Sequence, residues 1–248
     1  LPIPAHFLKC KNDLGMMIKK LWKLVEKEKP NLILVFGDTY SSLAGAMAGA
    51  YTNTPVAHVE AGMRSYSKEM PEEKNRVLID HLSTVLLCAN QNARLNLLKE
   101  GIRNNVYVVG DPMLDTLNRF CPIPKTDDYR TYNVLTLHRN FNADNKEALK
   151  NVLDAIKESG EKFVFPIHPR TKKNLKAMGL KIPQNLCVID PLPYGEMLKL
   201  ISNAKRVLTD SGGVQKEAFW MNVPVIILRN ETEWTEICTQ KGGVLVGT

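Results

Sequence analysis

Short apolar runs that alternate with segments of helical periodicity constrain this fold more than any other feature. The runs NLILVF at 31–36 and VPVIIL at 223–228 show no polar alternation, which is typical of strands buried on both faces. Residues 14–25 carry apolar side chains at helical spacing, and Pro30 ends that pattern just before the first run. Both runs are far shorter than the ~20 residues that cross a bilayer. We therefore expect an α/β protein with parallel sheets covered by helices and no membrane span.

Two domains are expected because the alternation stops and then restarts. In the first half we expect helices at 41–51, after 71–76 and at 91–100, and strands at 31–36, 55–60, 84–89 and 106–110. In the second half we expect helices at 144–158, 172–178, 194–202 and 214–220, and strands at 133–138, 162–167, 186–190, 206–210, 223–228 and 243–247. Residues 120–132 hold two prolines and a charge cluster without periodicity. We predict two doubly wound Rossmann-like domains, at 1–122 and 131–248, joined by a linker at 123–130.

Composition narrows the functional classes. The net charge of +7 comes from 33 basic and 26 acidic residues, and many lysines fall on predicted helix faces. Solvated helix surface explains this balance, and a polyanionic small molecule such as a nucleotide diphosphate would suit it equally well. No basic patch is interleaved with aromatic residues, so we expect no nucleic-acid partner.

Cysteine spacing and the N-terminal stretch bear on metal sites and on the location of the protein. The five cysteines lack the paired spacing of a zinc site or a redox dithiol, so we expect neither site. For the chain as a whole, we expect no metal and no other cofactor. The first ten residues have neither a basic n-region nor a long apolar h-region, which favours the cytoplasm.

Polar residues directly follow several predicted strands. They are Asp38, Glu60, His138, His168 and the run DSGG at 210–213. Ligands of open parallel sheets lie beyond the carboxyl ends of the strands. Any one of these residues could instead be a helix N-cap or a core polar group bonded to backbone. Five such strand ends in one chain indicate a shared ligand-binding cleft between the domains.

The segment TDSGGVQKE has the clearest local mechanism. Ser211, Gly212 and Gly213 lead directly into a predicted helix, where free backbone amides and the helix dipole favour a phosphate. Glu217 lies one turn further on, where its carboxylate could accept hydrogen bonds from a ribose diol. The alternative is a glycine turn followed by an ordinary first-turn glutamate.

Three carboxylates of the first half form a second group of candidates. Because carboxylates in one cleft repel each other, one of Asp38, Glu60 and Glu72 could act as a general acid while another remains a base. Oxygen ligands of this kind could equally hold Mg²⁺. For Glu72 the structural alternative is the acidic first turn of a helix that begins after Pro71.

The segment LHRN at 137–140 supplies a third group of candidates. His138 could donate a proton or contact a diphosphate, and Arg139 could clamp its charge. A single histidine at a strand end is also compatible with a structural role.

Six motifs occur in an order that resembles the UDP-N-acetylglucosamine 2-epimerase family. They are GDTYSSLAGAMAG, PVAHVEAGMRS, MPEEKNR, LHR, TDSGGVQKEA and RNETEWTE, within residues 37–236. The resemblance implies the GT-B fold, a UDP-sugar substrate and a homodimer. It implies catalytic positions at Asp38, Glu60, Glu72 and His138, and UDP- or sugar-binding positions at Ser211, Gly212, Gly213, Glu217, Arg76 and Arg229. Arg139 and His168, as strand-end residues, complete the set expected to bind the substrate.

Two departures from the family pattern qualify this expectation. The family begins with a strand and a GTRPE-like phosphate loop, which this sequence does not contain, so we expect the first domain to be N-terminally incomplete. Trp234 stands in TEWTE where relatives carry the arginine of TERPE, which resembles the archaeal and diacetamido uronic acid branch.

The resemblance leaves several activities open. The leading hypothesis is non-hydrolysing epimerisation at C2 of UDP-N-acetylglucosamine. The alternatives are a hydrolysing 2-epimerase, an epimerase of a UDP-diacetamido uronic acid, a GT-B glycosyltransferase and a binding module without catalysis.

Overall fold

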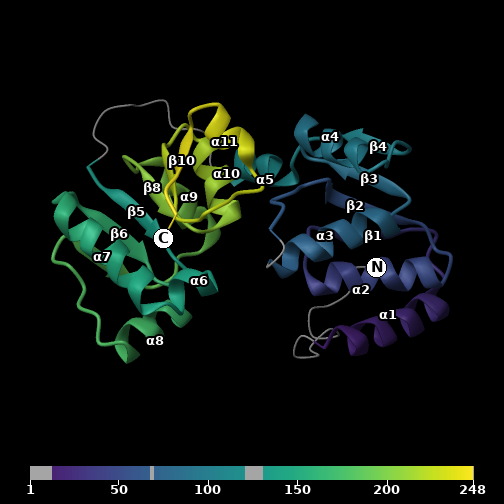
Figure 1. Ribbon diagram of the computed structural model, residues 1–248, viewed down its shortest axis with the longest axis horizontal. Helices are drawn as coiled ribbons and strands as arrows, with labels where there is room; N and C mark the ends of the chain where they lie inside the picture. The colour runs from purple at the N-terminus through teal and green to yellow at the C-terminus, as the bar shows by residue number, and fades with distance from the viewer. Residues whose placement is uncertain (1–12, 68–69, 121–130, 248) are drawn as a thin grey trace. The chain divides into compact units, whose positions relative to one another are not determined.

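The computed structural model describes residues 13–67, 70–120 and 131–247. The chain forms two compact units, Leu1–Asp111 and Pro112–Thr248 (Figure 1). The division falls ahead of the linker predicted at 123–130, and that linker lies outside the described residues. None of the described helices has the length and apolar character of a membrane-spanning segment.

The first unit contains one parallel sheet. Its elements are α1 (Leu14–Glu28), β1 (Ile33–Phe36), α2 (Tyr40–Tyr51), β2 (Val56–Ala61), α3 (Pro71–Leu82), β3 (Val85–Cys88), α4 (Gln91–Lys99) and β4 (Val106–Val108). The strands lie in the order β1-β2-β3-β4, and every neighbouring pair is parallel. These elements confirm the expected alternation. The expected burial of NLILVF on both faces is wrong, because β1 is the edge strand of the sheet and its Leu34 and Phe36 are exposed. The helix expected after 71–76 instead begins at Pro71, because proline is well suited to the first position of a helix.

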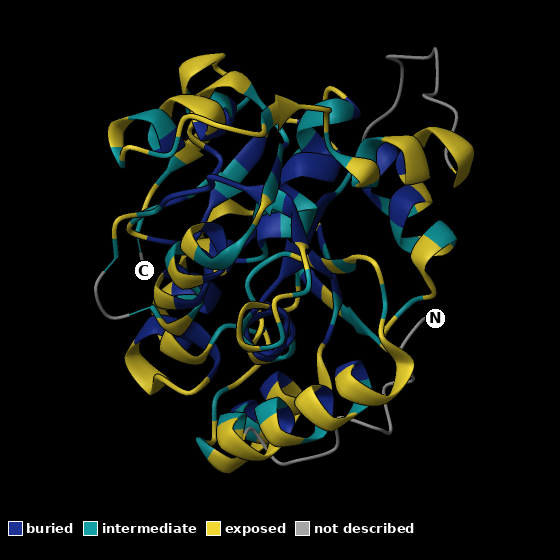
Figure 2. Ribbon diagram, turned by 90° about the vertical axis from the view of Figure 1, so that its right-hand side faces the viewer, coloured by how far each residue is buried: buried dark blue, intermediate teal, exposed yellow. Residues whose placement is uncertain are grey.

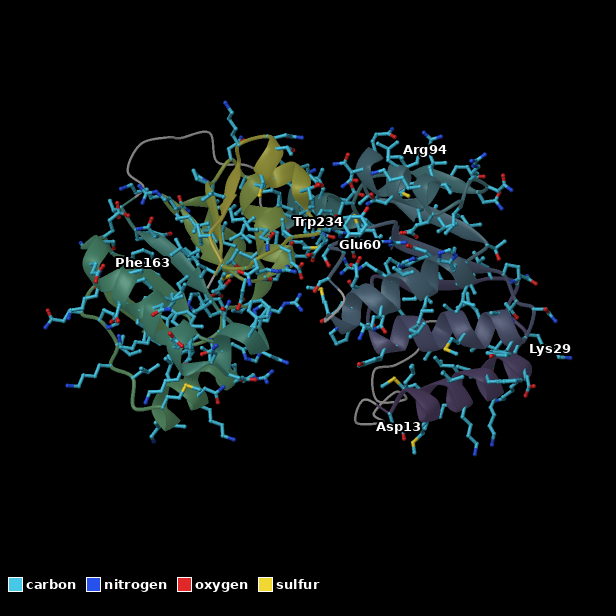
Figure 3. The ribbon with its side chains drawn as sticks, viewed as in Figure 1. Asp13, Lys29, Glu60, Arg94, Phe163 and Trp234 are labelled. Carbon is cyan, nitrogen blue, oxygen red and sulfur yellow. The ribbon has the colours of Figure 1, made fainter. Side chains whose placement is uncertain are left out.

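Helix α1 begins and ends where local chemistry requires. Asp13 accepts a hydrogen bond from the backbone of Met16 and so caps the first turn, and Lys29 ends the helix in a left-handed conformation with φ of 45°. Both residues are marked at the two ends of the helix in Figure 3. The inward face packs on α2 through Met17, Leu21, Val25, Ala44 and Ala48.

Small residues let α2 lie close to the sheet. A Cβ added at Gly49 would lie 2.4 Å from a methyl carbon of Val56 on β2, which is closer than any real contact allows. Thr39 caps the helix by accepting a hydrogen bond from Ser42 N. The glycine and alanine spacing of GDTYSSLAGAMAG therefore has a packing cause, and the packing holds the turn before Thr39 at the end of β1.

The second unit contains a six-stranded parallel sheet in the order β10-β9-β8-β5-β6-β7. Its first elements are α5 (Pro112–Phe120), β5 (Asn133–Thr136), α6 (Asn140–Ala143), α7 (Lys146–Ser159), β6 (Phe163–Pro166), α8 (Pro169–Ala177) and β7 (Leu186–Ile189). They are followed by α9 (Tyr194–Ser202), β8 (Val207–Thr209), α10 (Gly212–Trp220), β9 (Val225–Ile227), α11 (Thr235–Thr239) and β10 (Gly243–Leu245). The chain moves outward from β5 to β7 and then returns to pair β8 with the other side of β5, so this unit is doubly wound.

The core explains why these segments become strands and helices. Figure 2 shows buried residues along the strands and exposed residues on the outward faces of the helices. In the second unit, one continuous core joins α7 to β5 and β6 through residues such as Leu135, Leu149, Ile156 and Phe165. The expected α/β class with two Rossmann-like domains is confirmed.

Three helices were not expected from the sequence. α6 and α11 have only four and five residues, too few for a periodic pattern. α5 packs against α9 and α10 and buries Leu117 completely, which explains why it belongs to the second unit rather than the first.

Candidate functional site

The reversal of strand order in the second unit places two predicted segments side by side. β5 and β8 pair in register from Val134 with Val207 to Thr136 with Thr209, and the hydroxyls of the two threonines lie 2.5 Å apart. LHRN follows β5 and DSGG follows β8. The reversal point of a doubly wound sheet is the usual place for a ligand.

Asp210 links these two segments, and the sequence-based predictions included it only as the first residue of the run DSGG, without a role of its own. Its fully buried carboxylate accepts hydrogen bonds from the backbone N–H groups of His138 (3.1 Å) and Arg139 (3.0 Å). The side-chain amide of Asn142 donates a third hydrogen bond at 3.1 Å. Asp210 therefore holds the loop that carries His138 and Arg139. Its position as the first residue after a buried strand was the signal that could have identified it.

His138 is partly buried and has charged neighbours of both signs. Burial lowers the pKa of His138, Asp210 opposes that shift, and the charges of Arg139 and Arg229 add to it. The Nδ1 atom lies 3.3 Å from Asp210 Oδ1. A lowered pKa favours the neutral ring near pH 7, which can accept a proton.

His168 lies beside His138 but is also a helix cap. The two ring centroids are 6.2 Å apart. The His168 ring accepts a hydrogen bond from Arg170 N and so caps α8, which matches the structural alternative for a strand-end residue. Its expected part in substrate binding stays a prediction.

The N-terminus of α10 is built as the segment TDSGGVQKE predicts. Ser211 caps the helix, accepting from Val214 N, and its own N–H donates to Thr209 Oγ1. A Cβ at Gly212 would lie 3.0 Å from Glu233 Oε1, and one at Gly213 would lie 3.4 Å from Met113 Cε. Neither glycine has a positive φ, so close packing rather than backbone conformation explains them.

Arg229 places a buried positive charge beside this helix end. The side chain is 1% exposed, and its Nη1 lies 4.0 Å from the Cβ position of Gly212. Nη2 lies 3.0 Å from Glu233 Oε2, yet neither Nη nitrogen makes a hydrogen bond with any described residue. Buried donors are normally satisfied, so a guanidinium held this way at a helix N-terminus is suited to an anion.

Glu217 lies buried on α10, one turn beyond the glycines. Burial raises the pKa of Glu217, while a hydrogen bond from Tyr194 and the charge of Lys216 oppose that rise. Lys216 is itself buried, with its ammonium 3.9 Å from the ring centroid of Trp234. The Glu217 carboxylate accepts a hydrogen bond from the Tyr194 hydroxyl and has the chemistry to accept another from a hydroxyl of a ligand.

In the first unit, the structure places the Glu60 carboxylate against the turn that carries Asp38. Asp38 follows β1, and Glu60 lies near the end of β2 (Figure 3). Glu60 has a φ of 73° at a register shift between β2 and β3, and this conformation is strained for a residue that is not glycine. A Cβ at Gly37 would lie 3.3 Å from Glu60 Oε2, which puts the Glu60 carboxylate against the turn that carries Asp38. Strain of this kind occurs often at functional sites.

Arg76 is tied to the first carboxylate. It forms a short ion pair with Asp38 and a second pair with Glu73 at 3.2 Å, and its side chain is almost fully buried. Asn75 donates to the Asp38 backbone carbonyl at 2.8 Å. These contacts hold Asp38 in place, and the expected contact of Arg76 with substrate stays a prediction.

Glu72 and Glu73 are neighbours with different environments. Both lie in the acidic first turn of α3, as the structural alternative predicts. Glu73 is buried and accepts hydrogen bonds from Ser65 N at 2.9 Å and Tyr66 N at 3.0 Å, so it is occupied structurally. Glu72 is half-buried, and its catalytic role stays a prediction.

No metal site is evident in the described part of the chain. Within residues 13–67, 70–120 and 131–247, no three side chains of His, Cys, Asp or Glu are grouped as metal ligands.

Comparisons with known proteins identify the family. Residues 6–248 match the sequence profile described as UDP-N-acetylglucosamine 2-epimerase. The chain belongs to this family. A protein of Methanococcus maripaludis named as a UDP-N-acetylglucosamine 2-epimerase homolog is 45% identical over 94% of this chain and 70% of its own length. The family assignment made from the six motifs is confirmed.

Two further family members are informative, one because its structure is known and the other because its name specifies a different UDP-sugar. The UDP-GlcNAc 2-epimerase of Methanocaldococcus jannaschii, solved with UDP-GlcNAc and UDP, is 42% identical, with a TM-score of 0.85 over 94% of this chain and 70% of that chain. A Pseudomonas aeruginosa relative named UDP-2,3-diacetamido-2,3-dideoxy-D-glucuronate 2-epimerase is 41% identical over 94% of this chain and 68% of its own length.

Proposed function

We propose that this chain interconverts UDP-N-acetylglucosamine and UDP-N-acetylmannosamine without net hydrolysis. The observation that carries the proposal is the N-terminus of α10, where the buried guanidinium of Arg229 lies beside Gly212. The chain belongs to this epimerase family. Amides at a helix N-terminus together with a guanidinium suit a diphosphate. The relative of known structure that was solved with UDP-GlcNAc and UDP supports the same ligand class.

The second unit is proposed to bind and release UDP. Ser211, Gly212 and Gly213 would present backbone donors to the diphosphate, with Arg139 and Arg229 neutralising its charge. Glu217 would accept hydrogen bonds from the ribose, and His168 would contact the substrate nearby. Stabilising the charge on departing UDP lowers the barrier to breaking the bond between C1 and the phosphate oxygen.

The first unit is proposed to handle the proton on C2. That proton is not acidic enough for simple removal, so C1 must lose UDP as C2 loses the proton, which leaves a 2-acetamidoglucal with a double bond between C1 and C2. UDP then adds back to C1 while an acid protonates C2 from the opposite face. Asp38, Glu60 and Glu72 are the proposed acid and base groups, because inversion needs proton transfer on both faces. His138 is the fourth proposed catalytic group, and Arg76 is proposed to act with Asp38.

The direct test is incubation with UDP-N-acetylglucosamine in D₂O, followed by proton NMR. We expect UDP-N-acetylmannosamine to appear with deuterium at C2. Absence of C2 exchange, with this sugar and with the diacetamido uronic acid analogue, would reject the proposal. Free UDP with free N-acetylmannosamine would indicate a hydrolysing enzyme. UDP loss that requires an added acceptor would indicate a glycosyltransferase, and UDP binding without turnover would indicate a binding module.

The two neighbouring glutamates provide a matched pair for the test. Glu72→Gln is expected to lower kcat about 100-fold or more with little change in melting temperature, because a proton-transfer group contributes about 10²- to 10⁴-fold. Glu73→Gln is expected to lower the melting temperature, since Glu73 holds the backbone of Ser65 and Tyr66. The opposite pattern would exclude Glu72 from the chemistry.

A second candidate substrate is the diacetamido uronic acid sugar, favoured by the relative from Pseudomonas aeruginosa. The ratio of kcat/KM for the two UDP-sugars decides between them. Turnover is expected to continue in EDTA, because no metal is part of the proposed mechanism. A homodimer, which the family resemblance implies, and a cytoplasmic location, which the N-terminal stretch favours, are also proposed, and light scattering after gel filtration tests the dimer.

A further inference from the structure

The first unit contains a buried polar network that the proposed chemistry does not use directly. His58 lies in the middle of β2 and Asp80 in the last turn of α3, and the side chains of both are 0% exposed. His58 Nδ1 lies 2.6 Å from Asp80 Oδ1. Arg64 donates to the other oxygen of Asp80 at 2.7 Å. Buried charges cost stability unless they are paired, so such a network needs a reason.

The other side of the His58 ring reaches the turn that carries Asp38. His58 Nε2 lies 2.9 Å from the backbone carbonyl oxygen of Gly37. A carbonyl oxygen can only accept, so Nε2 is the donor of this bond. The Asp80 carboxylate accepts from Nδ1, and in this arrangement both ring nitrogens donate. His58 thus connects Asp80 to the peptide that joins Gly37 to Asp38.

Asp80 also reaches the second carboxylate segment. Its Oδ2 accepts a hydrogen bond from Gly62 N at 3.1 Å, two residues beyond Glu60. Glu60 and Gly37 both have a positive φ, at 73° and 61°, and the Glu60 carboxylate lies against Gly37. One buried carboxylate therefore fixes both strand ends that carry the proposed acid and base groups.

We infer that His58 and Asp80 form a positioning pair that holds Asp38 and Glu60 at the spacing the reaction needs. This inference rests on the proposed function. The pair does not touch the substrate, and it acts through the Gly37 carbonyl and the Gly62 amide. Reacting groups displaced by about 1 Å lose on the order of 100-fold in rate, so fixing two turns from one buried point has a measurable effect.

Two substitutions at His58 separate the bond to Gly37 from the bond to Asp80. The side-chain amide nitrogen of glutamine occupies nearly the place of Nε2, so His58→Gln keeps the donor to Gly37. The amide nitrogen of asparagine occupies nearly the place of Nδ1, so His58→Asn keeps the donor to Asp80 and loses the other. Ile79→Val is the control, because Ile79 is a fully buried neighbour of Asp80 in the apolar core.

The readouts are kcat and KM for C2 epimerisation, with the melting temperature measured for each variant. His58→Asn is expected to lose about 100-fold in kcat with KM changed less than about threefold, whereas His58→Gln stays within about tenfold of wild type. Ile79→Val is expected to melt earlier with kcat unchanged. Equal loss in both His58 variants, or kcat near wild type in His58→Asn, would overturn the inference.

A further variant leaves the buried pair intact if the His58 variants fail to fold. Gly37→Ala places a methyl 3.3 Å from Glu60 Oε2 on the same turn, at a φ of 61°. Gly37→Ala is expected to lower kcat about tenfold or more with KM nearly unchanged. A kcat equal to that of the wild type would show that the turn can be displaced without loss of rate, and this result would overturn the inference. Wild-type protein without C2 exchange is a separate outcome that rejects the proposed function instead.

Discussion

Replacing Asp210 tests whether one buried carboxylate holds the predicted nucleotide site. Asp210 is 0% exposed and accepts from His138 N, Arg139 N and Asn142 Nδ2. Asp210→Ala removes all three acceptor contacts, although Asn142 keeps a second bond to the Leu228 carbonyl. All three donors bond to Oδ2 of Asp210. Asp210→Asn keeps one side-chain oxygen, which can take the place of Oδ2 and still accept these hydrogen bonds.

The magnitude follows from the donors left without a partner. A buried backbone N–H without an acceptor costs about 1–3 kcal/mol, and hydrogen bonds to a charged group contribute about 1.5–3 kcal/mol each. Two such amides are orphaned in Asp210→Ala, and a water that enters the space recovers part of the loss. We expect the free energy of unfolding of the second unit to fall by about 3–5 kcal/mol in Asp210→Ala. Asp210→Asn is expected to lose about 1–2 kcal/mol, since most of its contacts survive.

The positions of the tryptophans allow the second unit to be followed by itself. The chain has three tryptophans, of which Trp22 lies on α1 and is partly exposed, whereas Trp220 and Trp234 lie in the second unit. In a Trp22→Phe background, urea unfolding followed by fluorescence therefore reports the second unit. The affinity of Asp210→Ala for UDP, measured by calorimetry, is expected to be lower than that of the wild type, as is its free energy of unfolding. Loss below about 1 kcal/mol in Asp210→Ala, or equal loss in both variants, would refute the reasoning.

Three further predictions follow from burial and pKa. Glu217→Gln is expected to weaken UDP binding about tenfold or more, because this is the effect of losing one hydrogen bond to a charged group. A Kd for UDP that calorimetry finds unchanged would reject the proposed contact between Glu217 and the ribose. Burial lowers the pKa of His138 from 6.5, so the folded chain binds that proton less tightly than the unfolded chain. Its free energy of unfolding should decrease as pH falls from about 6.5 toward the lowered pKa, and His138→Gln should abolish this component in urea titrations at several pH values. Burial raises the pKa of Cys88 to about 12, so iodoacetamide at pH 8 should label exposed Cys187 and leave Cys88 unlabelled in peptide maps, and labelled Cys88 in native protein would contradict this.

The elements that the sequence predicted well are those with local causes. Both apolar runs without polar alternation became strands of parallel sheets, but only β9 lies between two other strands, whereas β1 is the edge strand of its sheet with Leu34 and Phe36 exposed. DSGG leads into α10, because a serine N-cap followed by two small residues starts a helix. The α5 helix was missed, because its assignment to the second unit depends on packing against α9 and α10 rather than on its own pattern.

The sequence by itself determined the α/β class, the strand ends that carry polar residues and the family to which the chain belongs. Only the tertiary structure separated Glu72 from Glu73, which are adjacent in the sequence but differ in burial and in hydrogen bonding. It also revealed the hydrogen-bond partners of Asp210 and His58, which lie 71 to 72 and 21 to 22 residues away. Segment periodicity is a local property, whereas the partner of a buried charge is set by which strands become neighbours, and that information lies in the packing of the whole unit.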